Sequence, residues 1–487
     1  MKTTYIKIIL IIILLFTLSD IFPAQWKTYS SRDYYRITDS IIEDINNDNI
    51  DEIIISYYEK GNKFVDIYNT ADDKLNLIDQ IKVPYYTVFF DVGDIDNNKK
   101  NDIIFLSSDG LYYKQISSKI DEKHEIIQVK SVKSEIVVPQ PELLTDVEMV
   151  IDLNGDGQNE LIIENIRAVE IYETKNFTKL AAIDMETILE YALIPGQFYP
   201  HLIFYTLPII QVKDIDNDKN MEIITKFPSS INIYSHEGLT LWKLRNKFHI
   251  GSDNIYFLSN AYLKFAFPVI EDTDNDNIKE IVVSSANLDM PRLRFEAIGD
   301  LYYLDKKYFK LNKNKKIIVK GIPLNLPKFY NISNKKYKDF ILPSVPFNLI
   351  SIFGLLSGSG SLKVPFIYYK QDSTTFDLKS PEKLFDIPVR IENITSFVEE
   401  LPFDQYEAGA FPDFYYFIHD LKNKTVDIMY YCYGEKNKYI SDKIETLNIP
   451  TYNFELPATL KLGRLTKNKR KDVVYMTHKN IFILTRK

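Results

Sequence analysis

Short apolar segments alternate with acid-rich turns along most of the chain. One turn is followed by ELIIEN, AVEIYET and KLAAIDME, and the next turn by EIITKF, SINIYSH and TLWKLR. Alternating or continuous apolar positions in short segments are typical of β-strands, and no helical periodicity lies between them. Three or four such strands in each unit of roughly 60 residues predict the four-stranded blades of a β-propeller.

The turns share one pattern. Positions 1, 3 and 5 are Asp or Asn, position 9 is Asp or Glu, and position 10 is Ile or Leu. Five complete copies start at intervals of 50, 58, 62 and 58 residues, and they read DINNDNIDEI from Asp44, DIDNNKKNDI from Asp94, DLNGDGQNEL from Asp152, DIDNDKNMEI from Asp214 and DTDNDNIKEI from Asp272.

Three weaker copies follow, and they begin at Asn331 (NISNKKYKDF), Asp420 (DLKNKTVDI) and Arg464 (RLTKNKRKDV). From Asp44 to Arg464 is 420 residues, so seven intervals have a mean of 60. We therefore expect an all-β protein whose residues 25–487 form a single closed propeller of eight four-stranded blades. Seven blades are the alternative if the copy at Asp420 is false, because the intervals on either side of it are 89 and 44 residues.

The last blade lacks a strand in this scheme. The chain ends soon after the turn from Arg464, with the apolar segment NIFILTRK. We expect a strand from the region between Trp26 and Arg36 to complete the last sheet and close the ring, which leaves only short, protected sheet edges.

The first 24 residues are interpreted as a secretory signal peptide. Lys2 and Lys7 precede an apolar run of eleven residues, Ile8 to Leu18, and Ala24 suits the end of a cleavage site. The run is short for a membrane span of roughly 20 residues, although an uncleaved anchor is the alternative. We expect no transmembrane span in the mature chain, and a secreted, periplasmic or cell-surface location.

The turn chemistry indicates a hard cation. Carboxylates at positions 1, 3 and 5 direct alternate oxygens toward one centre, and the carbonyl at position 7 and the acid at position 9 complete six or seven oxygen ligands. Such a shell favours Ca²⁺ over Mg²⁺, whereas softer metals prefer Cys or His. Asp and Asn also form turns without any metal, but five copies at fixed spacing favour five structural Ca²⁺ sites. The expected ligands are Asp44, Asn46, Asp48, Glu52, Asp94, Asp96, Asn98, Asp102, Asp152, Asn154, Asp156, Glu160, Asp214, Asp216, Asp218, Glu222, Asp272, Asp274, Asp276 and Glu280.

Two features limit this interpretation of the turns. An EF-hand loop needs a bidentate Glu at position 12, and position 12 here is Ile55, Phe105, Ile163, Thr225 or Val283, which excludes that motif. The copy from Asn331 has Lys335 at position 5. An ammonium group there repels a divalent ion, so we expect no Ca²⁺ in the weaker copies.

The five complete turns, D-x-[DN]-x-[DN]-x-x-x-[DE]-[IL], resemble the FG-GAP or VCBS repeats of the integrin-α-type β-propeller family over most of the mature chain. The Phe-Gly and Gly-Ala-Pro signatures of that family are nearly absent, and the glycine usual at position 6 is found only as Gly157. The resemblance implies a calcium-stabilised propeller, often in a secreted or surface protein that binds other molecules.

Composition narrows the functional classes. The net charge is −8 and no basic domain stands out, so nucleic acid is not expected as a partner. The single cysteine, Cys432, excludes a disulfide framework and a multi-cysteine metal site. None of the six histidines has the spacing of a zinc hydrolase motif. We expect a monomer.

Two functions are compatible with these features. The first is a binding or adhesion module for a protein or glycan. The second is a polysaccharide lyase or another carbohydrate-active enzyme on the same scaffold, which would need a base with a near-neutral pKa and a cation or Arg clamp in one cleft. We favour binding, and we assign no catalytic residue and no cofactor other than Ca²⁺.

One interval suggests where a ligand binds. The 89 residues between Asn331 and Asp420 exceed the preceding interval of 59 by 30. We expect an insertion around residues 342–400, and insertions in repeat proteins often lie on the binding face. The segment contains GLLSGSGS and the run VPFIYYK, in which Tyr368, Tyr369 and Lys370 are candidate contact residues unless the run is a plain strand.

Overall fold

The protein is all-β in the part of the chain that the computed structural model describes, and no helix occurs among those residues. The described residues are 26–71, 74–116, 125–135, 142, 144–185, 188–192, 202–206, 209–227, 230–249, 269–289, 294–305, 310–320, 322–323, 328–333, 336–345, 361–371, 382–390, 403–404, 411–420, 423–434, 438–448, 459–467 and 471–486. The signal peptide expected at residues 1–24 lies outside them.

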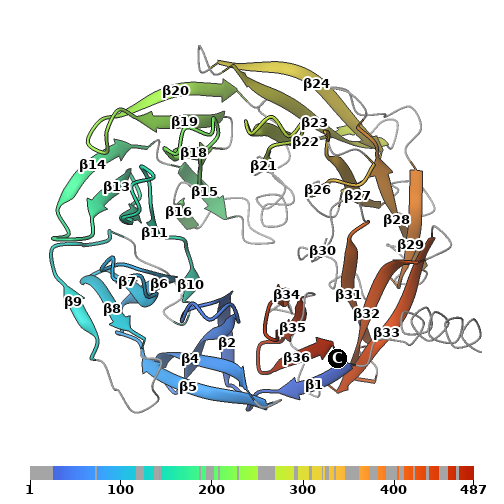
Figure 1. Ribbon diagram of the computed structural model, residues 1–487, viewed down its shortest axis with the longest axis horizontal. Coiled ribbons are helices and arrows are strands. Elements are labelled where there is room, and N and C mark those ends of the chain that lie inside the picture. The colour runs from blue at the N-terminus through green and yellow to red at the C-terminus, as the bar shows by residue number, and fades with distance from the viewer. Residues whose placement is uncertain are drawn as a thin grey trace, which may run out of the picture.

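The strands form sheets that follow one another in chain order around a ring (Figure 1). The first sheet contains β2 (Arg36–Glu43), β3 (Glu52–Glu59), β4 (Asn62–Ala71) and β5 (Lys74–Lys82). The second contains β6 (Thr87–Gly93), β7 (Asp102–Ser107), β8 (Gly110–Gln115) and β9 (Ile127–Val129), with β10 (Thr145–Asp146) parallel to β6. The third contains β11 (Val150–Ile151), β12 (Glu160–Glu164), β13 (Ala168–Glu173) and β14 (Lys179–Asp184). The fourth contains β17 (Ile209–Lys213), β18 (Glu222–Lys226), β19 (Ser230–His236) and β20 (Trp242–His249).

The second half of the ring is built in the same way. The fifth sheet contains β21 (Val269–Glu271), β22 (Glu280–Asp289), β23 (Arg294–Asp305) and β24 (Lys310–Lys320). The sixth contains β25 (Ile322–Pro323), β26 (Lys328–Tyr330), β27 (Asp339–Val345), β28 (Ser361–Tyr369) and β29 (Glu382–Arg390). The seventh contains β30 (Phe403–Asp404), β31 (Asp413–Asp420), β32 (Thr425–Gly434) and β33 (Lys438–Asn448). The eighth contains β34 (Thr459–Gly463), β35 (Asp472–Met476), β36 (Ile481–Arg486) and β1 (Trp26–Ser30). A separate hairpin pairs β15 (Ile188–Ala192) with β16 (Leu202–Thr206).

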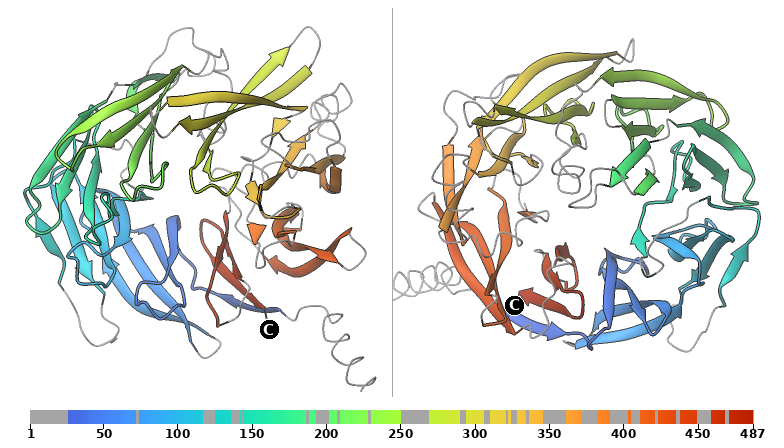
Figure 2. Two further views of the ribbon diagram at one scale, coloured as in Figure 1. Left: turned by 45° about the horizontal axis from the view of Figure 1, so that its top comes forward. Right: turned by 180° about the vertical axis from the view of Figure 1, so that it is seen from behind.

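The N-terminal strand completes the last sheet, as the sequence predicted. β1 pairs antiparallel with β36, from Trp26 opposite Arg486 to Ser30 opposite Phe482. An apolar cluster also joins the eighth sheet to the first, and it includes Ile53 and Ile55 of β3 and Ile481 and Ile483 of β36. The mostly four-stranded antiparallel sheets in Figures 1 and 2 are arranged as in a β-propeller, and closure of the ring and the count of eight blades stay predictions.

Apolar side chains hold the sheets face to face. The second strand of each sheet is largely buried on both faces over the residues whose burial the structure describes; β7, for example, reads DIIFLS and is buried throughout. Ile54 and Phe105 belong to a cluster between the first and second sheets, and Ile104 and Ile163 belong to one between the second and third. Continuous apolar strands therefore occupy the middle of each sheet, where both neighbours cover them.

One buried carboxylate ties two sheets together. Asp91 of β6 accepts backbone N–H bonds from Met149 at 2.6 Å and from Val150 at 3.0 Å. Asp91 is 6% exposed and also accepts the Val92 N–H at 2.7 Å; the Met149 and Val92 bonds are buried, whereas Val150 is half-buried. We expect Asp91→Ala to lower the free energy of unfolding by about 2–4 kcal/mol, because two buried donors lose their partner. Urea unfolding followed by circular dichroism tests this. Asp91→Asn, which retains an acceptor oxygen, is expected to lose less, and equal losses in the two variants would contradict the explanation.

The copy of the turn from Asp420 is wrong. Asp420 ends β31 and lies in the hairpin to β32, where it accepts a bond from the Asn423 N–H at 3.0 Å. The acid that begins the second strand of the seventh sheet is Asp413. The acids at this place are Glu52, Asp102, Glu160, Glu222, Glu280, Asp339, Asp413 and Asp472, so the longest interval is the 74 residues from Asp339 to Asp413 instead of 89.

The aromatic run VPFIYYK is a strand. Val364 to Tyr369 belong to β28, and Tyr368 and Tyr369 are 7% and 3% exposed, whereas Lys370 follows the strand and is exposed. These two tyrosines are therefore not available for ligand contact, and the plain-strand alternative holds for the run. Most of GLLSGSGS, within residues 346–360, lies outside the described residues, so the expected projecting insertion stays a prediction. In the described part of the chain, no helix has the length and apolar character to cross a membrane.

Candidate metal centres

Five turns of identical backbone shape join the first and second strands of the first five sheets. Each turn has positive φ angles at positions 4 and 6, such as 62° and 67° at Asn47 and Asn49, and 69° and 83° at Gly155 and Gly157. Asn and Gly tolerate this left-handed region better than other residues. Position 4 is always Asn or Gly, which is a signal for the turn that the acidic pattern alone did not use.

The acid at position 1 organises each turn. Asp94 accepts N–H bonds from position 5 (Asn98, 2.8 Å) and position 6 (Lys99, 2.6 Å). Asp272 does the same for Asp276 at 3.2 Å and Asn277 at 2.9 Å. In all five turns, the side chain at position 5 also accepts a hydrogen bond from the N–H of position 7. The turns therefore share one repeated pattern of hydrogen bonds to the backbone.

Three of the five turns bring three acids together. In each, one carboxylate oxygen from every acid lies within 4.8 Å of the others. Oxygens bound to one Ca²⁺ at about 2.3–2.6 Å lie at most about 5 Å apart, so this spacing suits a shared cation. The three groups are Asp94, Asp96 and Asp102; Asp214, Asp216 and Asp218; and Asp272, Asp274 and Asp276.

The acid at position 9 is buried beside these groups. Glu222 and Glu280 are each 2% exposed and accept the N–H of position 2 at 2.8 and 2.7 Å. Burial raises the pKa of each to about 8, and the neighbouring acids of the turn add to this rise. Burial likewise raises the pKa of Glu52, Asp102 and Glu160 to about 7. A buried carboxylate among other acids favours a compensating positive charge.

Asp102 gives the clearest sign that a cation fits. It is the only Asp at position 9 of the five turns, and its side chain is one methylene shorter than Glu. It is 1% exposed, and neither carboxylate oxygen accepts a hydrogen bond of normal geometry, although the Ile95 backbone N–H partly offsets the rise in its pKa. One of these oxygens belongs to the group formed with Asp94 and Asp96. A buried, unpartnered carboxylate is costly, and a metal ion among the three acids would satisfy it.

The first and third turns do not form such a group of three acids. Their position 3 is Asn, and both amide nitrogens donate to acids of the same turn: Asn46 to Glu52 at 2.7 Å and Asn154 to Asp156 at 3.0 Å. The amide nitrogen thus takes a place that a third carboxylate or a cation takes elsewhere. The ligand roles of the remaining predicted residues of these turns stay predictions.

The three later sheets satisfy the corresponding acid without a cation. Asp339 accepts bonds from the Tyr368 hydroxyl at 2.9 Å and from the Gln371 N–H at 2.7 Å. Asp413 accepts from the Tyr430 hydroxyl at 2.7 Å, and Asp472 from the Thr466 hydroxyl at 2.9 Å. Lys335, expected to exclude a metal from the sixth turn, lies outside the described residues.

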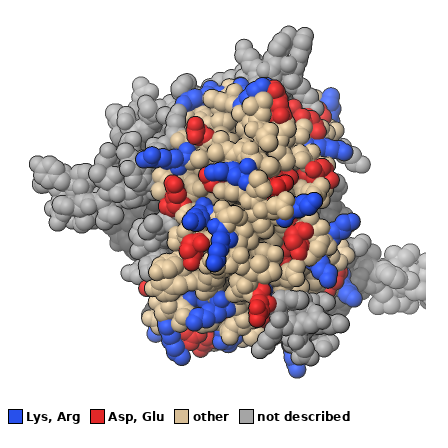
Figure 3. Space-filling model, turned by 90° about the vertical axis from the view of Figure 1, so that its left-hand side faces the viewer, with Lys and Arg blue, Asp and Glu red and all other residues tan. Residues whose placement is uncertain are grey.

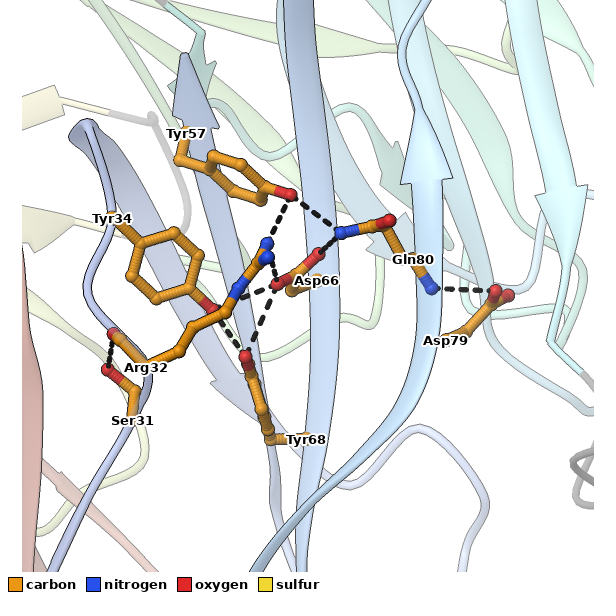
Figure 4. Close-up of polar contacts among 8 residues, drawn as sticks. All are labelled: Ser31, Arg32, Tyr34, Tyr57, Asp66, Tyr68, Asp79 and Gln80. Carbon is orange, nitrogen blue, oxygen red and sulfur yellow. Dashed lines mark hydrogen bonds and ion pairs between the residues drawn. The ribbon is translucent and has the colours of Figure 1, made fainter. Parts of the chain in front are cut away.

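A second polar cluster lies where the first sheet meets the eighth (Figure 4). Asp66 of β4 is fully buried and accepts bonds from Arg32 and Tyr34, both at 2.9 Å. Tyr68 and Gln80 donate to the same carboxylate at 3.3 and 3.1 Å. Burial raises the pKa of the Tyr34 hydroxyl well above its usual range. A phenol with a raised pKa is a poor general base, so the cluster suits a structural role better than catalysis.

Exposed tyrosines gather at the opposite end of the first sheet from its metal turn. Tyr35, Tyr85 and Tyr86 are 65%, 66% and 60% exposed. Tyr35 precedes β2 and contacts the half-buried Tyr58 near the end of β3, with ring centroids 6.5 Å apart. Tyr85 and Tyr86 follow β5 and meet edge to face at 5.1 Å. We call these four residues the tyrosine surface.

The loop with Tyr85 and Tyr86 is fixed to the same sheet end as Tyr58. Tyr58 lies opposite Lys63 in the pairing of β3 with β4. The Lys63 carbonyl accepts the Val83 N–H at 3.0 Å, and the Lys63 ammonium donates to the Thr87 carbonyl. Both flanks of the loop are therefore anchored.

The face of the molecule shown in Figure 3 has a different character from the tyrosine surface. Basic and acidic side chains are interspersed over it.

Comparisons with known proteins do not assign a family. No protein-family model matches the chain, and no curated protein matches it. Among solved structures, a lectin of Agrocybe aegerita that recognises terminal N-acetylglucosamine matches 72% of this chain and 81% of its own, with 11% identity and a TM-score of 0.40. The V. cholerae biofilm matrix protein Bap1 matches over 95% and 91%, with 11% identity and a TM-score of 0.34. A protein from Lactobacillus plantarum matches over 82% and 96%, with 10% identity and a TM-score of 0.36. Similarities this weak carry no argument about function, and the resemblance to FG-GAP or VCBS repeats rests on the turns.

Proposed function

We propose that this protein is a calcium-stabilised binding module, secreted or held at the cell surface, that recognises a protein or a glycan. The observation that carries the binding function is the tyrosine surface. Tyrosine offers a large, rigid contact area at a low cost in conformational entropy, and it is enriched at interface hot spots. Loops on a rigid scaffold are the usual place for such contacts.

The calcium assignment in this proposal rests on the donor set. The five turns offer carboxylates, amides and carbonyls, which are hard oxygen donors. The unpartnered carboxylate of Asp102 and the buried Glu222 and Glu280 would lie beside the ion. The bound ion would supply positive charge that holds each turn closed. The first turn would hold the adjoining ends of β2 and β3 in register. The other end of the same strands, with Tyr35 and Tyr58, would then keep its shape.

Substitution in the tyrosine surface tests the binding function. We expect Tyr85→Ser combined with Tyr86→Ser to weaken binding about tenfold or more, because exposed aromatic anchors dominate many interfaces. Binding is measured against a glycan array and against proteins captured from culture medium and then purified. The thermal unfolding midpoint is expected to stay unchanged, because both rings are more than half exposed.

A matched control removes apolar surface elsewhere. Leu241 precedes the outer strand β20 and Leu244 lies in it, and they are 47% and 50% exposed. Leu241→Ser combined with Leu244→Ser is expected to leave binding unchanged. Equal weakening in both double variants, or none in the tyrosine variant, would contradict the tyrosine surface as the contact site.

A further inference from the structure

Each metal turn is hydrogen-bonded to the turn before it through position 8. In the fifth turn, the Lys279 backbone N–H donates to the Ile215 carbonyl at 2.8 Å, and the Lys279 ammonium donates to the Asp214 carbonyl at 2.7 Å. In the third turn, the Asn159 amide donates to the Asp94 carbonyl at 2.9 Å. Position 8 makes related bonds elsewhere in the ring. The Asn101 side-chain amide donates to the Asp44 carbonyl at 3.3 Å, and the backbone N–H groups of Met221, Lys338 and Asp51 donate to the carbonyls of Leu153, Thr273 and Arg464 at 2.8 Å.

The acceptors of these links belong to the candidate metal centres. Asp214 provides a carboxylate oxygen to its group of acids, and its own carbonyl accepts the Lys279 ammonium. The N–H of Ile215 is held by Glu222 at 2.8 Å, and its carbonyl accepts the Lys279 N–H. Each of positions 1 and 2 therefore has two roles. Its carboxylate or N–H group interacts with acids of its own turn, and its carbonyl accepts a hydrogen bond from the next turn.

Backbone packing tightens one of these junctions further. A Cβ atom added at Gly155 would come within 2.8 Å of the Lys219 Cβ and 2.9 Å of the Lys219 carbonyl oxygen. Position 4 of the third turn thus touches position 6 of the fourth. Both residues have the left-handed backbone of the turns, with φ angles of 69° and 74°. A shape change in one turn cannot leave the other unaffected at this distance.

We propose that cation binding is coupled between adjacent turns through these position 8 contacts, so that the sites fill cooperatively around the first half of the ring. A cation that orders positions 1 and 2 also fixes the two carbonyls that the next turn needs. The next turn then loses less conformational freedom when it binds its own cation, and the coupling is reciprocal. This inference rests on the proposed calcium sites, but it concerns their dependence on one another.

The fourth and fifth turns are the best pair for a test, because both form groups of three acids and Lys279 of the fifth turn donates to two carbonyls of the fourth. Hydrogen exchange followed by mass spectrometry reports each turn separately, as the Ca²⁺ concentration that gives half-maximal protection. We expect Asp272→Asn, in the fifth turn, to raise this concentration for the fourth turn about fivefold or more. Asn at position 1 keeps a side-chain acceptor for the turn, so the variant retains the loop.

The control makes the same change at a distance. Asp44→Asn alters position 1 of the first turn, which has two turns between it and the fourth. Sites without shared contacts are nearly additive, so the fourth turn is expected to shift less than about twofold. In a Lys279→Met background, which removes the ammonium bond without touching a ligand, Asp272→Asn should have a smaller effect on the fourth turn than it has in the parent chain.

The outcomes separate the two proposals. Equal shifts of the fourth turn in Asp272→Asn and Asp44→Asn, or none in either, would overturn the coupling while leaving the calcium sites in place. Absence of Ca²⁺-dependent protection in every turn of the unaltered protein would overturn the calcium assignment, and the coupling with it. If Asp272→Asn fails to fold, Asp276→Asn removes a charge from the same group and gives the same test.

Discussion

Chelation of Ca²⁺ is expected to lower the thermal unfolding midpoint of this protein by several degrees. Extracellular calcium modules bind with dissociation constants of about 10⁻⁴–10⁻³ M. A ligand that binds only the folded state stabilises it by RT ln(1 + [L]/Kd), which is about 0.4–1.4 kcal/mol for each site at about 1 mM Ca²⁺. Five independent sites would add about 2–7 kcal/mol, and the three groups of three acids alone about 1–4 kcal/mol. Differential scanning calorimetry with and without chelator measures the shift.

Single substitutions locate the source of that stabilisation. Asp216→Ala, in the fourth turn, is expected to remove one site's share of the shift. Asp420→Ala changes an acid that lies in a plain hairpin between β31 and β32, so it should retain the whole Ca²⁺-dependent shift. An unfolding midpoint that is indifferent to chelator would mean that the acids only shape the turns.

Removal of the Asp66 carboxylate is expected to lower the free energy of unfolding by about 2–4 kcal/mol. Asp66 is fully buried and accepts bonds from Arg32, Tyr34, Tyr68 and Gln80. The Arg32 side chain is 44% exposed, so its ion pair contributes little. Most of the loss in Asp66→Ala comes from the buried hydroxyls of Tyr34 and Tyr68, which lose an acceptor. Urea unfolding gives the size of the loss.

The region of the structure that Asp66→Ala destabilises can also be tested. The cluster lies at the junction of the first and eighth sheets, where Ser31 donates its N–H to the Ile481 carbonyl at 2.9 Å. Hydrogen exchange in Asp66→Ala should therefore increase first in β1 and β36. Arg32→Ala is the milder control, because its side chain can already reach water. An equal loss of stability in Arg32→Ala and Asp66→Ala would show that the ion pair, not the buried hydroxyls, carries the energy.

The first five sheets and the last three differ in what lies beside the acid at the start of the second strand. In the early sheets the acid at the start of the second strand lies beside other acids, as Asp102 lies beside Asp94 and Asp96. In the later sheets a hydroxyl donates to it, as Tyr430 does to Asp413, although in the fifth sheet the Thr273 hydroxyl likewise donates to Glu280 at 2.6 Å. The same buried carboxylate can therefore be compensated by a cation or by a neutral donor. Stability of the second half is expected to depend less on Ca²⁺.

The five acidic turns were predictable from the sequence because each one is complete within ten consecutive residues, whereas the Ca²⁺ in them stays a proposal. Acids at positions 1, 3, 5 and 9 determine which backbone N–H groups they can reach, and no distant residue is needed to form the loop. The strands between the turns were predictable for a similar reason, since apolar residues on both faces of β7 and β12 require a sheet covered on both sides. The joining of β1 to β36 followed from the count of strands in the last sheet.

Contacts between distant segments were decided by the tertiary structure alone. The seventh turn was misplaced at Asp420 because the segment before Asp413 lacks the acidic pattern, and only the pairing of β31 with β32 identifies Asp413 as the corresponding acid. The cluster around Asp66 joins residues from a loop and three strands, and the link from Lys279 to Asp214 crosses 65 residues. Such contacts depend on strand register and on how the sheets pack, and neither is encoded in a short stretch of sequence. Local chemistry therefore specified the turns, and packing around the ring decided which of them touch.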